Sequence, residues 1–166
     1  MIRTLALLLF LALAACGFHL RGTANLPFET LYLPGATGGI ALELKRNIQS
    51  GSTTRVVDDA KSAQAQLRFT EETRTKEILS LNAAGRVREY RLIYRVGFGV
   101  GDAKGNEYLP PSTVTLTRDV TYDDAVALAK ETEEQLMFRD MQADMVQQIL
   151  RRLTAARAPA SASAAD

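Results

Sequence analysis

The 166-residue chain has very few of the side chains that build disulfide bonds, metal sites and histidine-based catalytic centres. It contains one cysteine, Cys16, one histidine, His19, and no tryptophan. A single cysteine excludes a disulfide within the molecule, even in an oxidising compartment. A Ser-His-Asp triad or a histidine-rich metal site would have to be built around His19, close to Cys16 in the sequence. The sequence therefore predicts neither catalytic residues nor a metal site.

An excess of charge of one sign is also missing. The chain has 20 lysines and arginines against 19 aspartates and glutamates, and its formal net charge is +1. No overall electric field therefore attracts nucleic acid or an anionic surface, and we expect no nucleic-acid partner. Any anion must be bound by a local cluster of basic side chains.

Two patterns that resemble catalytic motifs have simpler structural explanations. Paired carboxylates such as Glu71-Glu72 are adjacent in polar surroundings, whereas a glycosidase pair faces across an apolar pocket. Gly97, Gly99 and Gly101 alternate within a predicted strand and no helix follows them, so they do not form a phosphate loop. They predict a flat strand face that another backbone or a helix approaches closely. We expect a non-enzymatic protein without a cofactor.

The N-terminal residues have the layout of a bacterial lipoprotein signal. Arg3 is followed by an apolar run, Leu5–Leu13, that is too short to span a bilayer. Residues 13–16, Leu-Ala-Ala-Cys, resemble the lipobox. The resemblance implies removal of a signal peptide, residues 1–15, attachment of diacylglycerol to the sulfur of Cys16, and acylation of its new amine by a chain such as palmitate. Gly17, in place of aspartate, favours the outer membrane of a Gram-negative cell.

One domain is predicted between this leader and the C-terminal end. Residues 16–153 are enough for a single hydrophobic core of ordinary size. Residues 154–166 consist mostly of alanine and serine and contain nothing large to bury, so they are predicted to be a disordered tail.

Hydrophobic periodicity within the domain predicts an α+β fold. The expected strands cover residues 30–34, 65–81, 89–101 and 112–122. One expected helix opens at Gly38-Gly39 and is capped at its C-terminus by Gly51, a second covers about residues 124–153, and residues 55–57 are a candidate for a further short strand. We therefore predict a mostly antiparallel sheet of about four strands with two helices packed on it, in the order β-α-β-β-β-α.

The second predicted helix has an apolar row with a spacing of four residues: Met137, Met141, Met145, Ile149 and Leu153. A row with this spacing lies on one face of a helix, so it predicts burial in the core. Methionine also suits adaptable binding surfaces, which leaves a binding role for this row as the alternative.

The strands over 65–81 and 89–101 are joined by turn residues and predict one long hairpin. Its distal half is mostly charged, and its tip carries the apolar residues Ile78, Leu79 and Leu81. A polar arm with an apolar tip favours a partner that covers it, which makes these three residues candidates for contact with that partner. The alternative is a flexible polar hairpin with scattered apolar residues.

Basic residues gather in two places. One group is Arg86, Arg88, Arg91 and Arg95, at and just before the start of the predicted strand over residues 89–101. Lys130 lies near the start of the second predicted helix. Arginine and lysine bind phosphate, so these residues are candidates for an anion site. The alternative is pairing with nearby carboxylates, with Glu77 or Glu89 across the hairpin and with Glu134 one helical turn after Lys130.

Three short segments of the sequence resemble one family. Residues 16–22 (Cys-Gly-Phe-His-Leu-Arg-Gly), a glycine turn before Glu89-Tyr90, and residues 127–130 (Ala-Leu-Ala-Lys) are similar to those of the LptE family of lipopolysaccharide-assembly lipoproteins. The resemblance covers most of residues 16–153. It implies a protein that sits as a plug inside a large outer-membrane β-barrel, LptD, and helps to place lipopolysaccharide in the outer leaflet.

The resemblance also implies that basic side chains bind the lipid. Lys130 lies in a matching string and is carried over as a lipopolysaccharide-binding candidate. At the hairpin tip Asn82 and Ala83 are not basic, so any positive charge there comes from Arg86 or Arg88. The sequence is also compatible with two other functions: a lipoprotein scaffold of another envelope machine, such as the barrel-insertion complex, and a periplasmic hydrolase.

Overall fold

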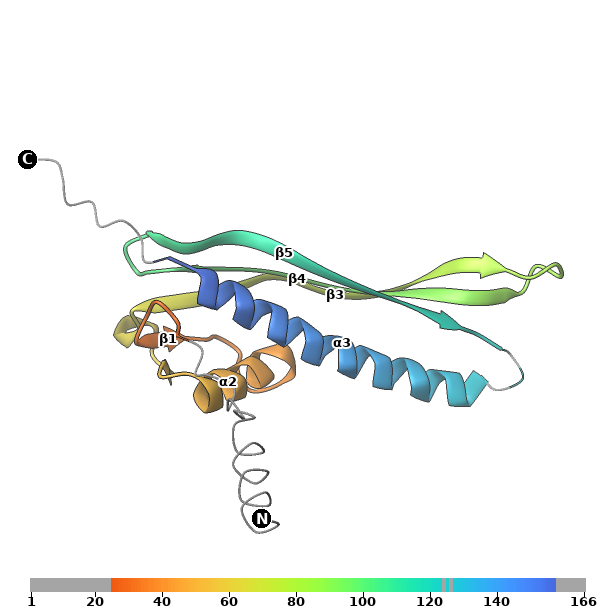
Figure 1. Ribbon diagram of the computed structural model, residues 1–166, viewed down its shortest axis with the longest axis horizontal. Helices are drawn as coiled ribbons and strands as arrows, with labels where there is room; N and C mark the ends of the chain where they lie inside the picture. The colour runs from red at the N-terminus through yellow and green to blue at the C-terminus, as the bar shows by residue number, and fades with distance from the viewer. Residues whose placement is uncertain (1–24, 124, 126, 158–166) are drawn as a thin grey trace, which may run out of the picture.

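A computed structural model describes residues 25–123, 125 and 127–157. The predicted leader, Cys16 and His19 lie outside the described residues. The elements in chain order are β1 (Thr30–Tyr32), α2 (Gly39–Gly51), β2 (Arg55–Val57), the 3-10 helix η1 (Ala60–Ser62), β3 (Ala65–Leu81), β4 (Val87–Gly101), β5 (Glu107–Thr121) and α3 (Ala127–Ala155). The strands form one sheet in the order β2-β1-β3-β4-β5, and α2 and α3 lie on one side of it (Figure 1).

The predicted α+β fold is confirmed, but the strand count is five and not about four. The additional strand is β2, which confirms the candidate short strand at residues 55–57. It pairs with β1 in parallel through three residues, and Arg55 N also donates to Glu29 O. Strand β1 also pairs with β3 in parallel, through Leu31 and Tyr32. Three-residue strands carry almost no periodic signal, so their pairing depends on the tertiary structure.

Three long antiparallel strands form the rest of the sheet. Strand β4 is paired with β3 over most of its length and with β5 from Glu89 to Gly101. The β3–β4 hairpin continues past the end of β5 and projects as a tip, at the right of Figure 1. The tip turn is stabilised by Asn82, whose side chain accepts bonds from the amides of Ala84 and Arg86, while Gly85 adopts a φ of 74°.

The glycines of β4 lie where the neighbouring strands come closest. A Cβ added to Gly99 would meet the backbone of Pro111 in β5 at 3.2 Å, and one added to Gly101 would meet the carbonyl oxygen of Asn106 at 3.1 Å. At Gly97 the side chain of Thr70 in β3 occupies the corresponding space. The expectation that another backbone approaches this strand face is therefore confirmed.

The hydrophobic core occupies the half of the molecule that contains α2 and the second half of α3. Met141, Met145, Ile149 and Leu153 of α3 are fully buried, and Met137 is partly buried, so the methionine row is confirmed as core. This face of α3 packs with α2 and with the apolar side of β4. The main partners from those elements are Ile40, Leu44 and Ile48 of α2 and Leu92, Tyr94, Val96 and Phe98 of β4.

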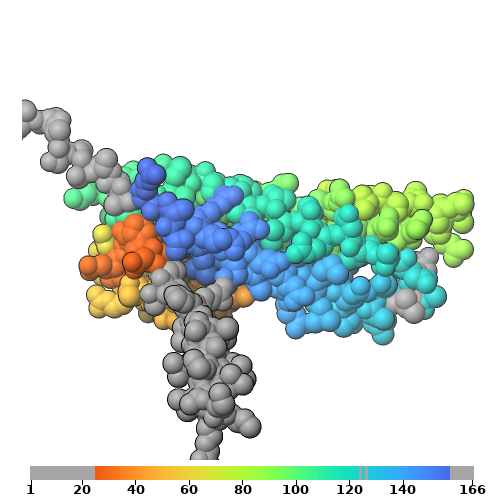
Figure 2. Space-filling model, viewed as in Figure 1, coloured from red at the N-terminus to blue at the C-terminus, as the bar shows by residue number. Residues whose placement is uncertain are grey.

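The other half of the molecule is held together mainly by polar contacts. Lys76 of β3 pairs with Glu134 in the first half of α3 and also lies over the ring of Tyr90 in β4. Nearer the middle of α3, Arg74 of β3 donates to Gln142 at 2.7 Å and Arg118 of β5 pairs with Asp144 at 2.8 Å. Figure 2 shows the resulting elongated shape, with the first half of α3 running beside the long strands. None of the described helices is long and apolar enough to cross a membrane.

Candidate functional site

The three apolar residues predicted at the hairpin tip are exposed. Ile78 is 60% accessible, Leu79 40% and Leu81 55%. Two further large apolar side chains, Leu128 at 78% and Leu136 at 50%, are exposed on the first half of α3. The tip and this helical face both belong to the distal half of the molecule, where β3, β4 and β5 extend away from the core (Figure 1).

The predicted binding residue Lys130 lies in a cluster of charged and aromatic side chains between α3 and the arm. Its ammonium group donates to Glu133 at 2.8 Å. Lys76 of β3 donates to Glu134 of α3 at 2.5 Å, and its nitrogen lies 4.2 Å from the ring centre of Tyr90. Both lysines and both glutamates line one small pocket together with Tyr90 and Tyr122, whose rings meet edge to face.

Arg91 and Arg95 lie on the opposite face of the sheet from Lys130. They alternate along β4 with Tyr90, Leu92 and Tyr94, whose side chains face α3. Arg91 donates two bonds to Asp119 of β5, at 2.8 and 2.9 Å, and Arg95 approaches Glu71 of β3 at 3.9 Å. The structure therefore brings neither arginine together with Lys130.

The two-bond contact with Arg91 also changes the titration of Asp119. Hydrogen bonding from the guanidinium holds the pKa of the Asp119 carboxyl below its usual range, and the same contact raises the pKa of Arg91. The carboxylate and the guanidinium thus stabilise each other's charged form.

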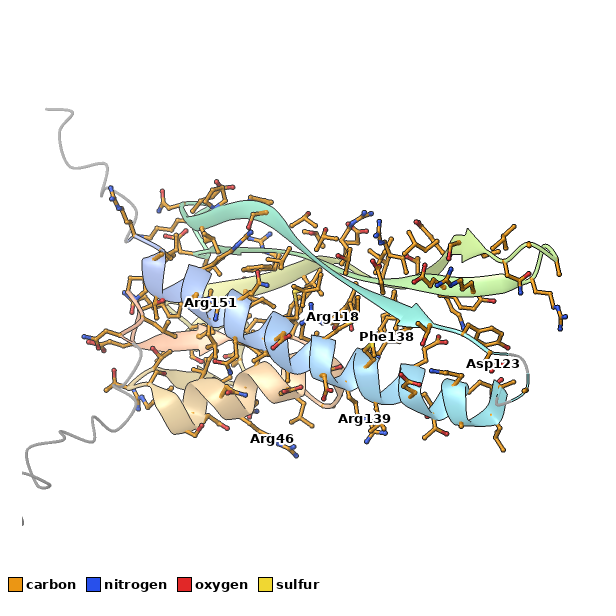
Figure 3. The ribbon with its side chains drawn as sticks, turned by 45° about the vertical axis from the view of Figure 1, so that its right-hand side comes forward. Arg46, Arg118, Asp123, Phe138, Arg139 and Arg151 are labelled. Atoms are coloured by element: carbon orange, nitrogen blue, oxygen red, sulfur yellow. The ribbon has the colours of Figure 1, made fainter. Side chains whose placement is uncertain are left out.

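Arg86 and Arg88 flank the tip turn and are exposed. Among the described residues neither side chain takes part in an ion pair or a side-chain hydrogen bond. Other basic side chains point away from the sheet on the helical side, including Arg46 of α2 and Arg139 of α3 (Figure 3). The unpaired positive charge of the arm is therefore concentrated at its tip.

The comparison with known proteins identifies the family. The sequence profile of the LptE family, described as lipopolysaccharide-assembly, matches residues 27–153. The chain belongs to the LptE family. The matched range contains all five strands, α2 and nearly all of α3, so the arm and the Lys130 cluster are inside it.

Relatives and solved structures agree with membership of the LptE family. The chain is 30% identical over 145 residues to the LPS-assembly lipoprotein LptE of Pectobacterium atrosepticum, covering 84% of this chain and 77% of the relative. A solution NMR structure of lipoprotein B from Nitrosomonas europaea is 40% identical, with a TM-score of 0.72 over 84% of this chain and 91% of that one. The rare lipoprotein B of Shewanella oneidensis is 27% identical with a TM-score of 0.66, over 76% of this chain and 94% of that one.

Two pairing expectations for this LptE-family chain are wrong in detail. Lys130 pairs with Glu133 and not with Glu134, which is held by Lys76. Glu89 meets the hydroxyl of Ser80 at 2.6 Å, and the ion pair of Arg91 is with Asp119 of β5, although Glu77 also contributes to the electrostatic environment of Arg91. Arg91, Arg95 and Lys130 are nevertheless each paired with a carboxylate.

Sequence reasoning missed Lys76, Leu128 and Leu136. A helical projection of residues 127–155 places Leu136 on the side opposite the methionine row and would have found it, whereas it places Leu128 beside the end of that row and gives no sign of its exposure. Lys76 had no such signal, because its partner Glu134 is 58 residues away in the sequence.

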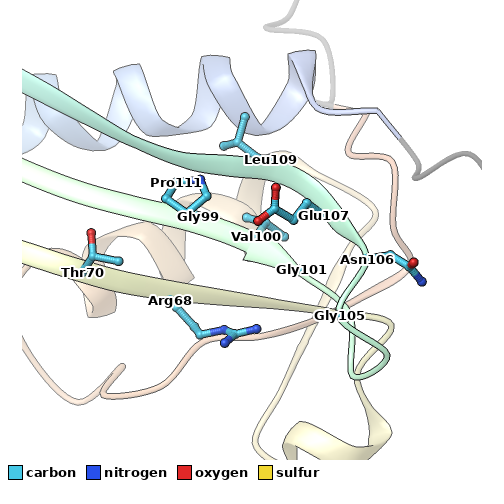
Figure 4. Close-up of a pocket in the computed structure, with 10 residues that line it drawn as sticks. All are labelled: Arg68, Thr70, Gly99, Val100, Gly101, Gly105, Asn106, Glu107, Leu109 and Pro111. Atoms are coloured by element: carbon cyan, nitrogen blue, oxygen red, sulfur yellow. The ribbon is translucent and has the colours of Figure 1, made fainter.

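A second pocket lies at the other end of the strands, with Gly99 and Gly101 in its lining (Figure 4). Arg68 of β3 and Leu109 and Pro111 of β5 also line it. Its volume is about 180 Å³, whereas pockets for drug-sized ligands measure about 300–1,000 Å³. It contains none of the residues predicted from the sequence to bind a ligand.

We expect Asp119→Asn to change the dependence of stability on pH. Because the pKa of Asp119 is depressed in the folded protein, its stabilising contribution is present above the carboxyl pKa of an unfolded chain, about 4, and is lost as the pH falls through the lower folded value. The variant is expected to have a lower Tm than the parent protein at pH 7, and the difference should shrink by pH 3.

Thermal unfolding at both pH values measures this effect. Asp140→Asn is the matched control, because Asp140 is exposed on α3 and takes part in no ion pair among the described residues. A Tm difference for Asp119→Asn that is as large at pH 3 as at pH 7 would contradict the prediction.

Proposed function

We propose that this LptE-family protein is an outer-membrane lipoprotein that plugs and helps to assemble an LptD-type β-barrel. We further propose that it binds lipopolysaccharide while that lipid is inserted into the outer leaflet. Relatives of this chain carry the name LPS-assembly lipoprotein. The mechanism is binding without turnover, and Cys16 carries the lipid that holds the protein at the periplasmic side of the membrane.

The plug function is supported mainly by exposed apolar side chains and an open strand edge in the distal half. Ile78, Leu81 and Leu128 are each more than half exposed on a protein of balanced charge. In addition, β3 pairs with β1 only through Ala65 and Gln66, so the remainder of that edge has no strand partner among the described residues. Exposed apolar side chains and open strand edges favour a covering partner, and the lumen of a barrel covers an elongated arm on all sides.

Lipopolysaccharide binding is assigned to the basic residues of the same half. Arg86 and Arg88 bring exposed positive charge to the tip, and Lys130 lies in the cluster between α3 and the arm. Guanidinium and ammonium groups bind phosphate through charge-assisted hydrogen bonds, and lipid A carries phosphates. Arg91 and Arg95 contribute only if the ligand replaces their carboxylate partners, Asp119 and Glu71.

A pull-down of the full-length lipoprotein in mild detergent tests this function. We expect a large LptD-like barrel to be recovered in a one-to-one ratio, identified by mass, together with lipopolysaccharide. Recovery of another barrel would instead support a scaffold of the barrel-insertion machinery. Recovery of no barrel would contradict the proposed plug function.

Leu81→Asp is expected to reduce recovery of the barrel severalfold. The substitution places a charge where an apolar side chain, 55% exposed in the isolated protein, would be covered, and burial of an unpaired charge is costly. Ala103→Asp is the matched control, because it adds the same charge to an exposed turn at the other end of the strands. Equal barrel recovery with both variants would remove the tip from the interface.

A further inference from the structure

We infer that Lys76 is the second cation of the Lys130 site. Glu133 and Glu134 form ion pairs with the two lysines until a phosphate-bearing lipid displaces these carboxylates. This inference rests on the proposed function, because it names how the lipid enters the site assigned to Lys130. It adds a binding residue, Lys76, and an internal competitor, the glutamate pair.

The geometry of the cluster assigns one carboxylate to each ammonium group. Lys130 bonds Glu133 at 2.8 Å and Lys76 bonds Glu134 at 2.5 Å. The lysines come from α3 and β3, but they line one pocket together with both glutamates. Two positive and two negative charges leave this cluster neutral, so in the free protein it offers an incoming anion no net attraction.

The lysines of this cluster are more sheltered than the arginines of the other ion pairs on the arm. The side chains of Lys76 and Lys130 are 33% and 21% accessible, compared with 41% for Arg91 and 49% for Arg118. A sheltered ammonium group is costly to leave without an anion, because water compensates it only in part. The two lysines therefore require a replacement whenever their glutamates leave.

The aromatic rings keep Lys76 in place during such an exchange. Its nitrogen lies 4.2 Å from the ring centre of Tyr90 and 5.7 Å from that of Tyr122, and these two rings pack edge to face at 5.1 Å. Cation–π attraction at these distances holds the ammonium group independently of Glu134. Lys76 is thus positioned by the strands, while the carboxylates are carried on an exposed helix.

Phosphate is a stronger competitor for the lysines than carboxylate. A phosphate monoester carries a charge of about −1.5 to −2 at pH 7 and has three acceptor oxygens, so one group can accept from both ammonium groups. Displaced glutamate side chains rotate into water at the surface of α3, where Glu133 is already 47% accessible and Glu134 is 25% accessible. Binding therefore exchanges two internal ion pairs for one ligand contact shared by two lysines.

Purified lipopolysaccharide and the mature lipoprotein in detergent provide the test. Glu133→Gln gives the cluster a net positive charge without removing a lysine, and we expect it to raise lipopolysaccharide affinity about two- to fivefold. Glu131→Gln is the matched control: it makes the same charge change two residues away, at an exposed glutamate that has no ion pair among the described residues. Its affinity should equal that of the parent protein.

Lys76→Gln is expected to weaken binding by at least the same factor, and Lys76→Arg, which keeps the charge, should restore most of it. Circular dichroism of each variant establishes that it is folded, and the arginine variant separates loss of charge from loss of structure. With lipopolysaccharide stripped of its lipid A phosphates, the gain of Glu133→Gln should disappear.

Lys130→Gln separates failure of this inference from failure of the proposed function. If Lys130→Gln weakens binding but Lys76→Gln and Glu133→Gln bind like the parent protein, Lys130 acts alone and the inference is overturned. If lipopolysaccharide binds equally well to Lys130→Gln, the lipid site proposed at Lys130 is itself wrong. A gain for Glu133→Gln that persists with the dephosphorylated lipid would overturn phosphate as the displacing group.

Discussion

Ile149→Ala is expected to lower the free energy of unfolding by about 2–5 kcal/mol. Ile149 lies on α3 where the helix packs on the core, and its side chain is fully buried. Truncation removes buried methyl groups and leaves a cavity that close-packed neighbours fill only in part. Urea unfolding followed by far-ultraviolet circular dichroism measures the change as a lower midpoint with an unchanged slope.

Leu136→Ala is the matched control for this change. It shortens an aliphatic side chain on the same helix, but Leu136 is 50% exposed, so an effect within about 0.5 kcal/mol is expected in the isolated protein. Equal losses for the two variants would mean that the two ends of α3 are packed alike, in conflict with the division into an apolar half and a polar half.

The apolar half is the part of the fold that periodicity predicts well. Alternation along β4 and the spacing of four in α3 arise because one face of each element is buried, and the structure buries those faces. The turn residues at 82–85 placed the hairpin turn. A capping pattern predicted a helix start near residue 124, whereas α3 begins at Ala127, because sequence patterns locate the ends of elements only to within a few residues.

The polar half was less predictable because its contacts join residues far apart in the sequence. The spacing of four residues predicted Glu134 as the partner of Lys130, although Glu133, at a spacing of three, is also one helical turn away. In the structure Glu134 is paired with Lys76 of β3, and Lys130 is paired with Glu133. Similarly, Asp119 was not considered for Arg91, because the register of β5 against β4 is a tertiary property.

The division into an apolar half and a polar half also explains which residues of the candidate surface could be predicted from the sequence. Ile78, Leu79 and Leu81 were recognisable because apolar residues at the end of a charged hairpin have no core to enter. Leu128 was not recognised, since a single leucine in a helix is ordinarily buried and only the structure gives its exposure of 78%. Both groups belong to the half that packs through ion pairs.

Cys16→Ser is expected to have the largest effect on the proposed function, because it removes the residue proposed to carry the whole lipid anchor. Each buried methylene contributes about 0.8 kcal/mol to membrane binding, so a single acyl chain anchors weakly and several chains anchor firmly. Serine has no thiol to receive diacylglycerol, and Cys16 is the sole cysteine of the chain, so no other residue can substitute and no disulfide is disturbed. The intact mass of the purified protein should therefore lack all acyl groups.

The leader complicates the reading of membrane fractions, because an uncleaved apolar run can itself hold the precursor at the inner membrane. A second form, with residues 17–166 behind an ordinary cleavable secretion leader, removes both the leader and the cysteine. We expect this form in the soluble periplasmic fraction and the parent protein in the outer membrane, with residues 1–15 absent and an acylated Cys16 at its N-terminus. An unacylated parent protein, or an outer-membrane location for the form without Cys16, would refute the lipid anchor while leaving the plug function to be tested by recovery of the barrel.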